Sequence, residues 1–339
     1  MRIILVGFGV VGQNFSRMII ERSEELVEKF RFYPRIVAIA DKGGAVINRR
    51  GVNIEYALKV KHQKGSVAYV DKFGVKDLDA NRVIEEVDAE VVVEVTPTNI
   101  VNGEPGLTHI KTALKMGKHV VTTNKGPLAL AFPALIELAK YNNLFLRFSG
   151  CVGGGTPILD FAKKCLLGDY ITSFKGILNG TTNYILTRMA TDKVSFEEAL
   201  LEAQKAGYAE ADPSLDIDGW DSACKLVILA NWVLGTKAVL QDVKVKGIRG
   251  ITLDDVKDAL KQNCEIKLIA SAENNKLEVK PQPISKTHPL CVGGTLNAVT
   301  FISKYAGEET IIGKGAGGIE TASAVLRDLL TIKESIIKV

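Results

Sequence analysis

The sequence predicts an α/β fold, in which a doubly wound parallel sheet fills the first 150 residues and a second, smaller α+β domain follows. Up to about residue 150, apolar strand-like runs alternate with segments of helical periodicity. A glycine-rich turn joins the first strand directly to the first helix. A second glycine-rich stretch, residues 150–157, marks a change in the order of the elements.

The elements of the first domain begin with an apolar strand at residues 3–6 and a helical pattern over residues 10–30. The following strands are expected at 36–40, 91–95, 119–122 and 144–148, with helices around 83–87, 107–116 and 133–141. In the second domain, residues 151–309, we expect strands that include 171–178 and 277–279, and helices at 158–167, 196–206, 222–234 and 253–263. Residues from about 310 to 339 hold a glycine-dense turn and a helical pattern, and are expected to pack back on the first domain.

Composition excludes several classes of protein. The 339 residues are 46% apolar and 24% charged, which is ordinary globular composition. The net charge of +4 comes from basic and acidic residues mixed along the chain, so no stripe for nucleic acid is expected. No apolar run approaches the roughly 20 residues of a membrane span. The five cysteines lack CxxC spacing and favour reduced thiols. We therefore expect a soluble, cytoplasmic protein without nucleic-acid or membrane partners.

The first glycine turn carries the clearest functional signal. It has GxGxxG spacing, with the first glycine permitting a tight turn, the second a close approach of a pyrophosphate, and the third packing of helix on strand. The N-terminus of the next helix supplies N–H groups and partial positive charge. This predicts a Rossmann-type domain that binds NAD or NADP through Gly7, Phe8, Gly9, Val10, Val11 and Gly12.

The residues that follow the second strand leave the choice of cofactor open. Asp41 ends that strand and is a candidate acceptor for the ribose hydroxyls of NAD, although it lies further from the turn than the usual ~20 residues. Lys42, Arg49 and Arg50 are candidates for the additional phosphate of NADP, or a solvated basic loop. Thr96 closes a parallel strand at the edge of the sheet where ligands bind, and is expected near the cofactor.

The polar chemistry of the second domain is densest between Glu210 and Lys225. Four further carboxylates follow Glu210 within eleven residues, and the segment runs into an apolar helix that carries Lys225. Asp221 precedes Lys225 by four residues, so the two share a helix face. A lysine among apolar neighbours is either held charged by carboxylates or releases its proton readily, and either state suits a proton carrier. A surface ion pair is the alternative. Lys125, just after a predicted parallel strand, is a second candidate that could hold a substrate oxygen.

Taken together, these motifs resemble the homoserine dehydrogenases over nearly the whole chain. The resemblance is carried by the first glycine turn and by the segments TNKGP at 123–127, VGGGTP at 152–157, GILNGTTNYI at 176–185 and GYAEADP at 207–213, in the family's order. It implies reversible NAD(P)-dependent conversion of L-homoserine to L-aspartate 4-semialdehyde, a step toward threonine, methionine and isoleucine. It also implies a homodimer formed through the second domain.

The resemblance assigns roles to individual residues. It implies that Lys225 donates and accepts the proton and that Lys125 polarises the reacting oxygen and lies near the cofactor. Substrate binding is implied for Glu210, Asp216, Asp221 and Thr181, and contact with the cofactor for Gly207 and Gly317. Many members bind sodium through backbone carbonyls, here those of Val152, Gly154 and Thr156, and a glutamate whose position Ser149 takes. Without that carboxylate we expect weak cation binding, if any. The family's appended regulatory domain is not expected after residue 339.

Two rival functions are open at this point. The first is a Rossmann aldehyde dehydrogenase with Cys151 as the nucleophile, for which His288 is the histidine in the second half of the chain that could serve as base. A small, packed Cys151 is the alternative, because its glycine neighbours suggest tight backbone packing. The second rival is a protein that binds NAD(P) without chemistry, in which the carboxylates of the second domain would be dispensable.

Overall fold

The computed structural model describes residues 1–337 and divides the chain into two compact units. Among these, residues 1–151 and 317–337 belong to the first unit, and residues 152–316 belong to the second. The expected return of the C-terminal segment from about residue 310 therefore needs a correction. Residues up to Lys314 complete a strand of the second unit, and only the following helix belongs to the first.

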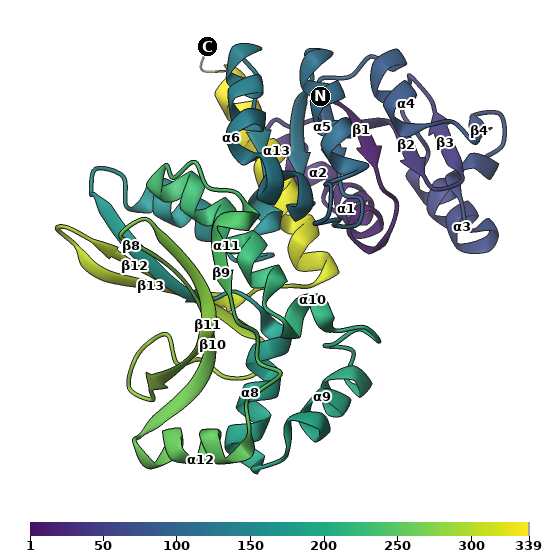
Figure 1. The fold of residues 1–339 in the computed structure, drawn as a ribbon. Coiled ribbons are helices and arrows are strands. Elements are labelled where there is room, and N and C mark those ends of the chain that lie inside the picture. Colours follow the sequence, from purple (N-terminus) through teal and green to yellow (C-terminus); the bar gives the residue numbers. More distant parts are fainter. Residues whose placement is uncertain (338–339) are drawn as a thin grey trace. The chain divides into compact units, whose positions relative to one another are not determined.

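A seven-stranded sheet forms the centre of the first unit, with the order β4-β3-β2-β1-β5-β6-β7 (Figure 1). Five strands are parallel, whereas β3 and β4 extend the β2 edge in antiparallel fashion. Its strands are β1 (Arg2–Val6), β2 (Arg35–Asp41), β3 (Gly44–Ile47), β4 (Gly74–Lys76), β5 (Val91–Glu94), β6 (His119–Thr122) and β7 (Leu146–Arg147). Its helices are α1 (Val10–Glu21), α2 (Ser23–Glu28), α3 (Ile54–Lys64), α4 (Ala80–Glu86), α5 (Gly106–Lys115), α6 (Lys125–Tyr141) and α13 (Gly318–Ile337). The fold class is confirmed; β3, α3 and β4 were not predicted.

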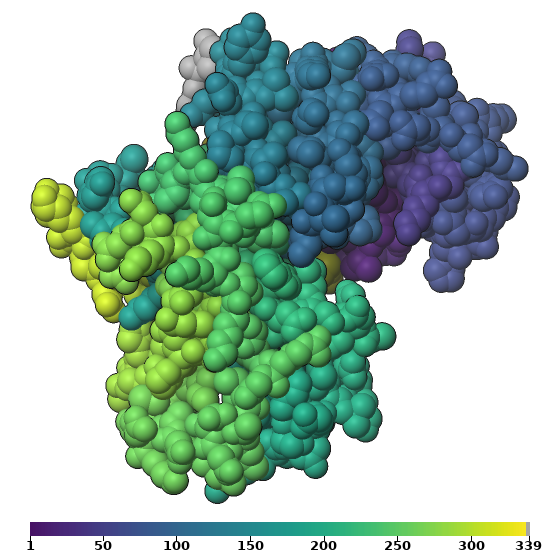
Figure 2. Space-filling view, in the orientation of Figure 1, coloured from purple at the N-terminus to yellow at the C-terminus, as the bar shows by residue number. Residues whose placement is uncertain are grey.

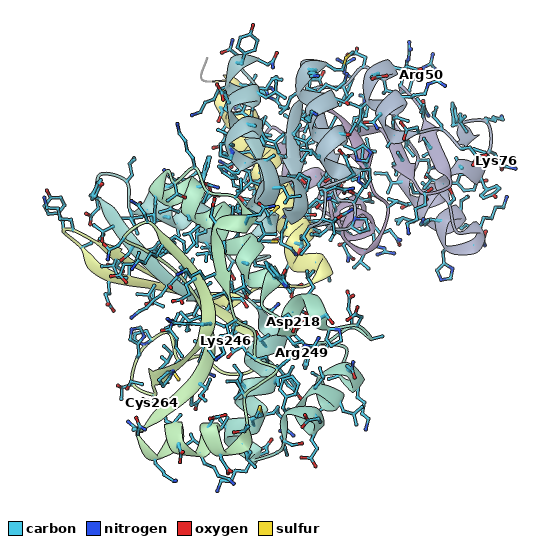
Figure 3. All side chains as sticks on the ribbon, viewed as in Figure 1. Arg50, Lys76, Asp218, Lys246, Arg249 and Cys264 are labelled. Atoms are coloured by element: carbon cyan, nitrogen blue, oxygen red, sulfur yellow. The ribbon has the colours of Figure 1, made fainter. Side chains whose placement is uncertain are left out.

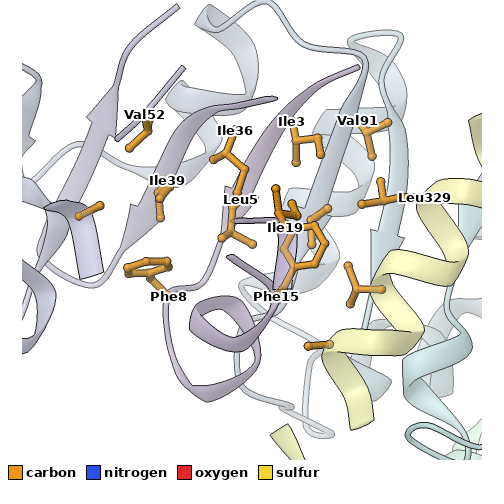
Figure 4. Packing of buried hydrophobic residues seen from close by; sticks show 14 of the residues in the cluster. Ile3, Leu5, Phe8, Phe15, Ile19, Ile36, Ile39, Val52, Val91 and Leu329 are labelled. Carbon is orange, nitrogen blue, oxygen red and sulfur yellow. The ribbon is translucent and has the colours of Figure 1, made fainter. Parts of the chain in front are cut away.

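The core of the first unit is built by the apolar runs that predicted its strands. Ile3, Leu5 and Ile39 are fully buried, and Phe15 of α1 packs in the same cluster (Figure 4). Leu329 of α13 joins it from the far end of the chain. Helix α13 thus completes the cover of the face that α1 begins, which explains why the C-terminal segment carries an apolar stripe.

The β3–α3–β4 segment forms one end of the first unit, as the ribbon and the space-filling view both show (Figure 2). It follows β2 directly, so the strand that ends at Asp41 is followed by a tight antiparallel turn and not by a crossover helix. Asp41 pairs with Gly44 across this turn. The insertion decides where the polar residues after β2 lie.

The second unit contains a six-stranded, mainly antiparallel sheet with the order β13-β12-β8-β10-β11-β9. Its strands are β8 (Ile171–Ile177), β9 (Val243–Val245), β10 (Cys264–Glu273), β11 (Lys276–Ser285), β12 (Leu296–Ser303) and β13 (Gly307–Lys314). Its helices are α7 (Ile158–Asp160), α8 (Gly180–Asp192), α9 (Phe196–Lys205), α10 (Ser214–Ile217), α11 (Trp220–Leu234) and α12 (Leu253–Lys261). Helix α11 is buried almost throughout, and it contacts strands β8, β9, β10 and β11.

Candidate active site

The glycine turn between β1 and α1 has the geometry of a pyrophosphate cradle. Gly7 has φ +101°, and a Cβ there would lie 2.7 Å from the carbonyl oxygen of Val95. A Cβ on Gly12 would lie 2.3 Å from the carbonyl oxygen of Gly7. A Cβ on Gly9 would meet no atom within 4 Å, and no side chain caps the helix that begins after it. The start of α1 therefore has open space beside Gly9 and no side-chain cap, which fits the phosphates of NAD(P).

The C-terminal turn lies against the start of α1 in the same unit. A Cβ on Gly318 would lie 2.4 Å from Cγ1 of Val10, and the preceding Gly317 has φ +131°. Val10 is exposed, whereas Phe8 is buried in the core, so only the backbone of Phe8 is available to a ligand. This places Gly317 beside the glycine turn, as the predicted cofactor contact requires.

Polar residues meet at the carboxyl ends of β5 and β6. Glu94 is fully buried and accepts hydrogen bonds from Thr96 N at 3.1 Å and Thr122 Oγ1 at 2.9 Å. Asn124 Nδ2 donates to Thr96 Oγ1 at 3.1 Å and caps α6, whose first residue is Lys125. Asn124 thus links Thr96 to the start of the helix that carries Lys125, at the edge where ligands bind. Glu94 was not predicted as a site residue. The signal for it in the sequence is a carboxylate that ends an apolar strand at this edge of the sheet.

Asp41 has a different environment from the one expected. Its carboxylate accepts hydrogen bonds from Lys61 Nζ at 2.7 Å, Ser66 Oγ at 2.6 Å, Gly43 N at 3.0 Å and Val67 N at 3.1 Å. Burial by itself raises the pKa of Asp41, but these hydrogen bonds outweigh it and the pKa lies below its usual value. A carboxylate offers about four acceptor positions. The expected ribose contact would therefore require one of these donors to leave.

Arg49 and Arg50 lie at the wrong edge of the sheet for the phosphate of NADP. Because β3 runs antiparallel to β2, the chain after β3 returns to the start of β2, where Val52 N donates to Ile36 O at 2.8 Å. A Cβ on Gly51 would contact Arg35, the first residue of β2. Arg50 is exposed there (labelled in Figure 3). The two arginines thus form a solvated loop, and the exposed Lys42 alone keeps its predicted place beside the carboxyl end of β2.

In the second unit, Lys225 is held in a buried ion pair on α11. Its Nζ lies 2.6 Å from Asp221 Oδ2 and donates to the carbonyl oxygen of Leu178 at 2.6 Å. Lys225 is 6% exposed and Asp221 is 5% exposed. The surface-pair alternative is therefore wrong. An ammonium has three N–H groups, so the two acceptors present in the described chain leave one for a substrate atom.

A second carboxylate and an amide complete this cluster. Asn179 Nδ2 donates to Asp216 Oδ1 at 2.7 Å and to Asp221 Oδ2 at 2.8 Å. Burial and the charge of Asp221 raise the pKa of Asp216, while Lys225, Asn179 and Thr181 oppose the rise. We call Asp216, Asp221, Lys225 and Asn179 the carboxylate–lysine cluster. Asn179 was missed, although an Asn between a strand and a helix is a recognisable N-cap signal.

The loop before α12 holds Asp216 in place. Ile248 N donates to Ile217 O at 2.8 Å, which ties residues 246–250 to α10. Arg249 forms an ion pair with Asp218 and donates to Ser214 Oγ at 2.9 Å (Asp218 and Arg249 are labelled in Figure 3). Helix α10 is only four residues long, so these contacts fix a segment that has little helical stability of its own.

The other residues expected to bind substrate or cofactor in this unit differ in exposure. Thr181 is buried, and its hydroxyl donates to the carbonyl oxygen of Tyr208 at 2.7 Å. Glu210 and Gly207 are exposed in the loop that follows α9. The structure therefore brings Thr181 together with the carboxylate–lysine cluster, whereas the Glu210 carboxylate lies on the surface.

The sodium prediction concerns backbone carbonyls and stays a prediction. Thr156 N donates to Gly153 O at 2.8 Å, and Thr156 Oγ1 donates to Lys314 O at 3.1 Å. Ser149, at the position of the family's glutamate, donates through N and Oγ to the fully buried Asp328, both at 2.7 Å. In residues 1–337, no three His, Cys, Asp or Glu side chains are grouped to hold a metal ion.

The cysteine chemistry of the rival dehydrogenase has no support in the structure. Cys151 is 2% exposed, and its thiol donates to the carbonyl oxygen of Thr122 at 3.5 Å. His288 is engaged elsewhere: its Nδ1 accepts from Leu290 N at 2.9 Å and its Nε2 lies 3.6 Å from Glu308. Cys151 is therefore a packed residue, as the alternative interpretation held.

Comparison with known proteins identifies the family of the chain. Residues 7–149 match the model of the homoserine dehydrogenase NAD-binding domain, and residues 157–330 match that of homoserine dehydrogenase. A homoserine dehydrogenase of Methanocaldococcus jannaschii is 45% identical, with 99% of each chain covered. The structure of a putative homoserine dehydrogenase from Archaeoglobus fulgidus has a TM-score of 0.90 at 40% identity and covers 98% of this chain and 99% of its own. A hyperthermophilic archaeal homoserine dehydrogenase in complex with NADPH has a TM-score of 0.84 at 30% identity, with 98% of each chain covered. With both halves of the chain matched and full-length relatives at this identity, the chain belongs to the homoserine dehydrogenase family.

Proposed function

We propose that this chain catalyses the reversible NAD(P)-dependent interconversion of L-homoserine and L-aspartate 4-semialdehyde. One observation supports it above the others: Lys225 is buried, paired with Asp221, and retains one N–H for a substrate atom beside a second carboxylate, Asp216. An alcohol oxidation needs such a group to take the hydroxyl proton. A protein that only binds NAD(P) has no use for a buried cluster of this kind.

The residues of the cluster have different roles in this reaction. Lys225 Nζ takes the hydroxyl proton during oxidation and returns it during reduction. Asp221 holds the lysine in position, and Asp216 and Asp221 offer negative charge to the substrate ammonium. The family resemblance adds the exposed Glu210, outside the cluster, to these carboxylates. Thr181 takes the substrate carboxylate, as the family resemblance implies. Lys125 polarises the reacting oxygen on the same ground.

The first unit holds the cofactor in this proposal. The open space at Gly9 and the uncapped start of α1 fit the pyrophosphate of NAD(P), and Gly317 and Thr96 lie beside the turn or at its sheet edge. NAD(P) accepts the hydride from homoserine or gives it to the semialdehyde.

Steady-state oxidation of L-homoserine by the purified protein and by Lys225→Met and Lys125→Ala tests the proposal. We expect turnover to fall by about 100-fold or more in each, with NAD(P) affinity, measured by cofactor fluorescence, retained in Lys225→Met. Lys267→Met is the matched control, because Lys267 is also fully buried and ion-paired, 3.0 Å from Glu265, but lies outside the cluster. Unchanged turnover in Lys225→Met would disprove the mechanism.

The wider setting of the reaction is also proposed. We place it in the biosynthesis of threonine, methionine and isoleucine, and in the cytoplasm, on the family resemblance and the free cysteines.

We further propose a homodimer formed through the second unit. Leu167, Tyr170 and Tyr305 support it: they are 84%, 68% and 74% exposed, and Lys304 N donates to Tyr170 O at 3.0 Å, which joins their segments. Tyr170→Asp should lower the mass measured by light scattering. In the described part of the chain, no helix has the length and apolar character to span a membrane.

A further inference from the structure

Asn179 occupies the turn between β8 and α8, next to the carbonyl that binds Lys225. As the N-cap of α8, its Oδ1 accepts from Thr182 N at 2.8 Å and from Thr182 Oγ1 at 3.0 Å. A backbone N–H can only donate, so the oxygen of this amide must face Thr182 and its nitrogen must face the other way. The orientation of the Asn179 amide is therefore fixed by the helix that it caps.

The nitrogen of this amide faces two carboxylates. It donates to Asp216 at 2.7 Å and to Asp221 at 2.8 Å, and Asn179 is only 5% exposed. The Asp221 oxygen that receives this bond is also the one 2.6 Å from Lys225 Nζ. Lys225 donates in turn to the carbonyl of Leu178, the residue before Asn179. One turn of the chain thus contacts every member of the cluster.

Two buried carboxylates that share a site repel each other, and one of them tends to take up a proton. Around Asp216 the charged groups are Asp221 and Lys225 on α11 and the Asp218–Arg249 pair beside α10, with the neutral side chains of Asn179 and Thr181 on the α8 side. Lys225 contacts Asp221 and not Asp216 in the described structure. The amide of Asn179 is therefore the donor that serves both carboxylates at once.

We propose that Asn179 is a positioning residue that keeps Asp216 and Asp221 ionised together and so preserves the negative charge that receives the substrate ammonium. The inference rests on the proposed function for its kinetic consequence, but not for its effect on Asp216. Substitution should raise the pH below which kcat/KM for homoserine declines. The glycine turn proposed to hold the pyrophosphate lies in the other unit, so NAD(P) affinity should not change.

Two substitutions separate this role from simple capping. Asn179→Asp and Asn179→Ser both keep a side-chain oxygen for the cap, and Asp and Ser are good N-cap residues. Both remove the amide donor, but only Asp adds charge. We expect the acidic limb of the kcat/KM profile to move up by about one pH unit in Asn179→Ser and further in Asn179→Asp. A shift of one pH unit lowers kcat/KM about tenfold at acidic pH. Asn53→Asp is the matched control, since Asn53 caps α3 by accepting from Tyr56 N at 2.9 Å and lies in the first unit.

The outcomes distinguish this inference from the proposed function. If the wild type does not oxidise L-homoserine, the proposed function fails, but carbon-13 NMR titration of labelled aspartates still tests Asn179. The Asp216 signal, assigned with Asp216→Asn, should titrate at higher pH in Asn179→Ser than in the wild type. An unchanged Asp216 titration overturns the inference, as does an acidic limb that moves in Asp but stays in Ser. A pH-independent loss of activity that follows the melting temperature would also overturn it, because that is the signature of a cap alone.

Discussion

Lys225 and Asp221 lie one helical turn apart on α11, with Nζ and Oδ2 separated by 2.6 Å and both side chains buried. Removing the charge of Asp221 would leave a buried ammonium with a neutral carbonyl as its acceptor, which is costly. We predict that Asp221→Asn lowers the free energy of unfolding by about 3–5 kcal/mol in urea denaturation.

A substitution in an exposed ion pair with the same spacing provides the control for this loss of stability. Glu86→Gln breaks another i,i+4 pair, Arg82–Glu86, which is exposed, and should cost less than about 1 kcal/mol. The double variant Asp221→Asn with Lys225→Met should regain part of the loss, because no buried charge is left unpaired. Equal costs for the buried and exposed substitutions would contradict the assignment.

The glycine turn predicts opposite effects for two alanine substitutions. A Cβ at Gly9 meets open space, so Gly9→Ala should fold normally, with a melting temperature within about 2 °C of the wild type. The added methyl group would occupy space needed by the pyrophosphate, and affinity for NAD(P) should fall about tenfold or more.

Gly12→Ala, in contrast to Gly9→Ala, should lower the stability of the fold. Its Cβ would lie 2.3 Å from the carbonyl oxygen of Gly7, so the turn must shift, at a cost of about 1–3 kcal/mol in stability. Gly250→Ala is the control, since its Cβ also meets nothing within 4 Å but lies in the second unit. The assignment fails if Gly9→Ala and Gly250→Ala bind NAD(P) equally well.

The hydrogen bonds to Asp41 predict a pH-dependent contribution to stability. The pKa of Asp41 in the folded protein is below its unfolded value, so the stabilisation is complete above the unfolded pKa of about 4 and is lost as the pH falls through the folded pKa. Asp41→Asn should therefore cost about 1–3 kcal/mol at neutral pH. The difference from the wild type should narrow as the pH falls below about 4.

Urea denaturation across this pH range measures the effect. Asp71→Asn provides the comparison, because Asp71 is an exposed carboxylate that accepts from Tyr56 Oη at 2.6 Å in the same part of the unit. It should change stability little at any pH. A difference for Asp41→Asn that stays constant down to acid pH would show that the charge of Asp41 does not stabilise the fold.

Local patterns predicted the parallel strands and the glycine turn because each depends on neighbouring residues. Helix boundaries were less accurate. Helix α6 begins at Lys125 and not near Pro133, because Asn124 caps it there. Pro133 is accommodated inside the helix by a kink at Ala131, whose φ and ψ are not helical. The single helix expected over residues 10–30 is interrupted at Arg22, which lies outside helical φ and ψ between α1 and α2. A single residue decides where a helix is capped or kinked, whereas hydrophobic periodicity is a property of a whole segment and does not reveal that residue.

Long-range partners explain the rest of the site. Asn179 meets Asp216 and Asp221, which lie 37 and 42 residues further along the chain, so no local pattern reveals that contact. The environment of Asp41 differs from the expected one because its donors, apart from Gly43, lie 20 to 26 residues later, around an unpredicted insertion. Lys225 and Asp221 were found because they lie on one helix face, four residues apart.

The geometry after β2 makes a prediction about cofactor choice. Asp41 stays ionised, but the ammonium of Lys61 at 2.7 Å offsets its charge, so its repulsion of the additional phosphate of NADP is weakened, and the exposed Lys42 lies beside it. We predict that Lys42→Ala weakens NADP binding about tenfold and NAD binding far less, since a charged hydrogen bond to phosphate is worth roughly 1.5–3 kcal/mol. Arg50→Ala removes an exposed cation from the opposite edge and should leave both affinities unchanged. Fluorescence titration of NADPH and NADH against the three proteins decides it: equal losses for both cofactors in Lys42→Ala, or a selective loss in Arg50→Ala, would place the phosphate elsewhere.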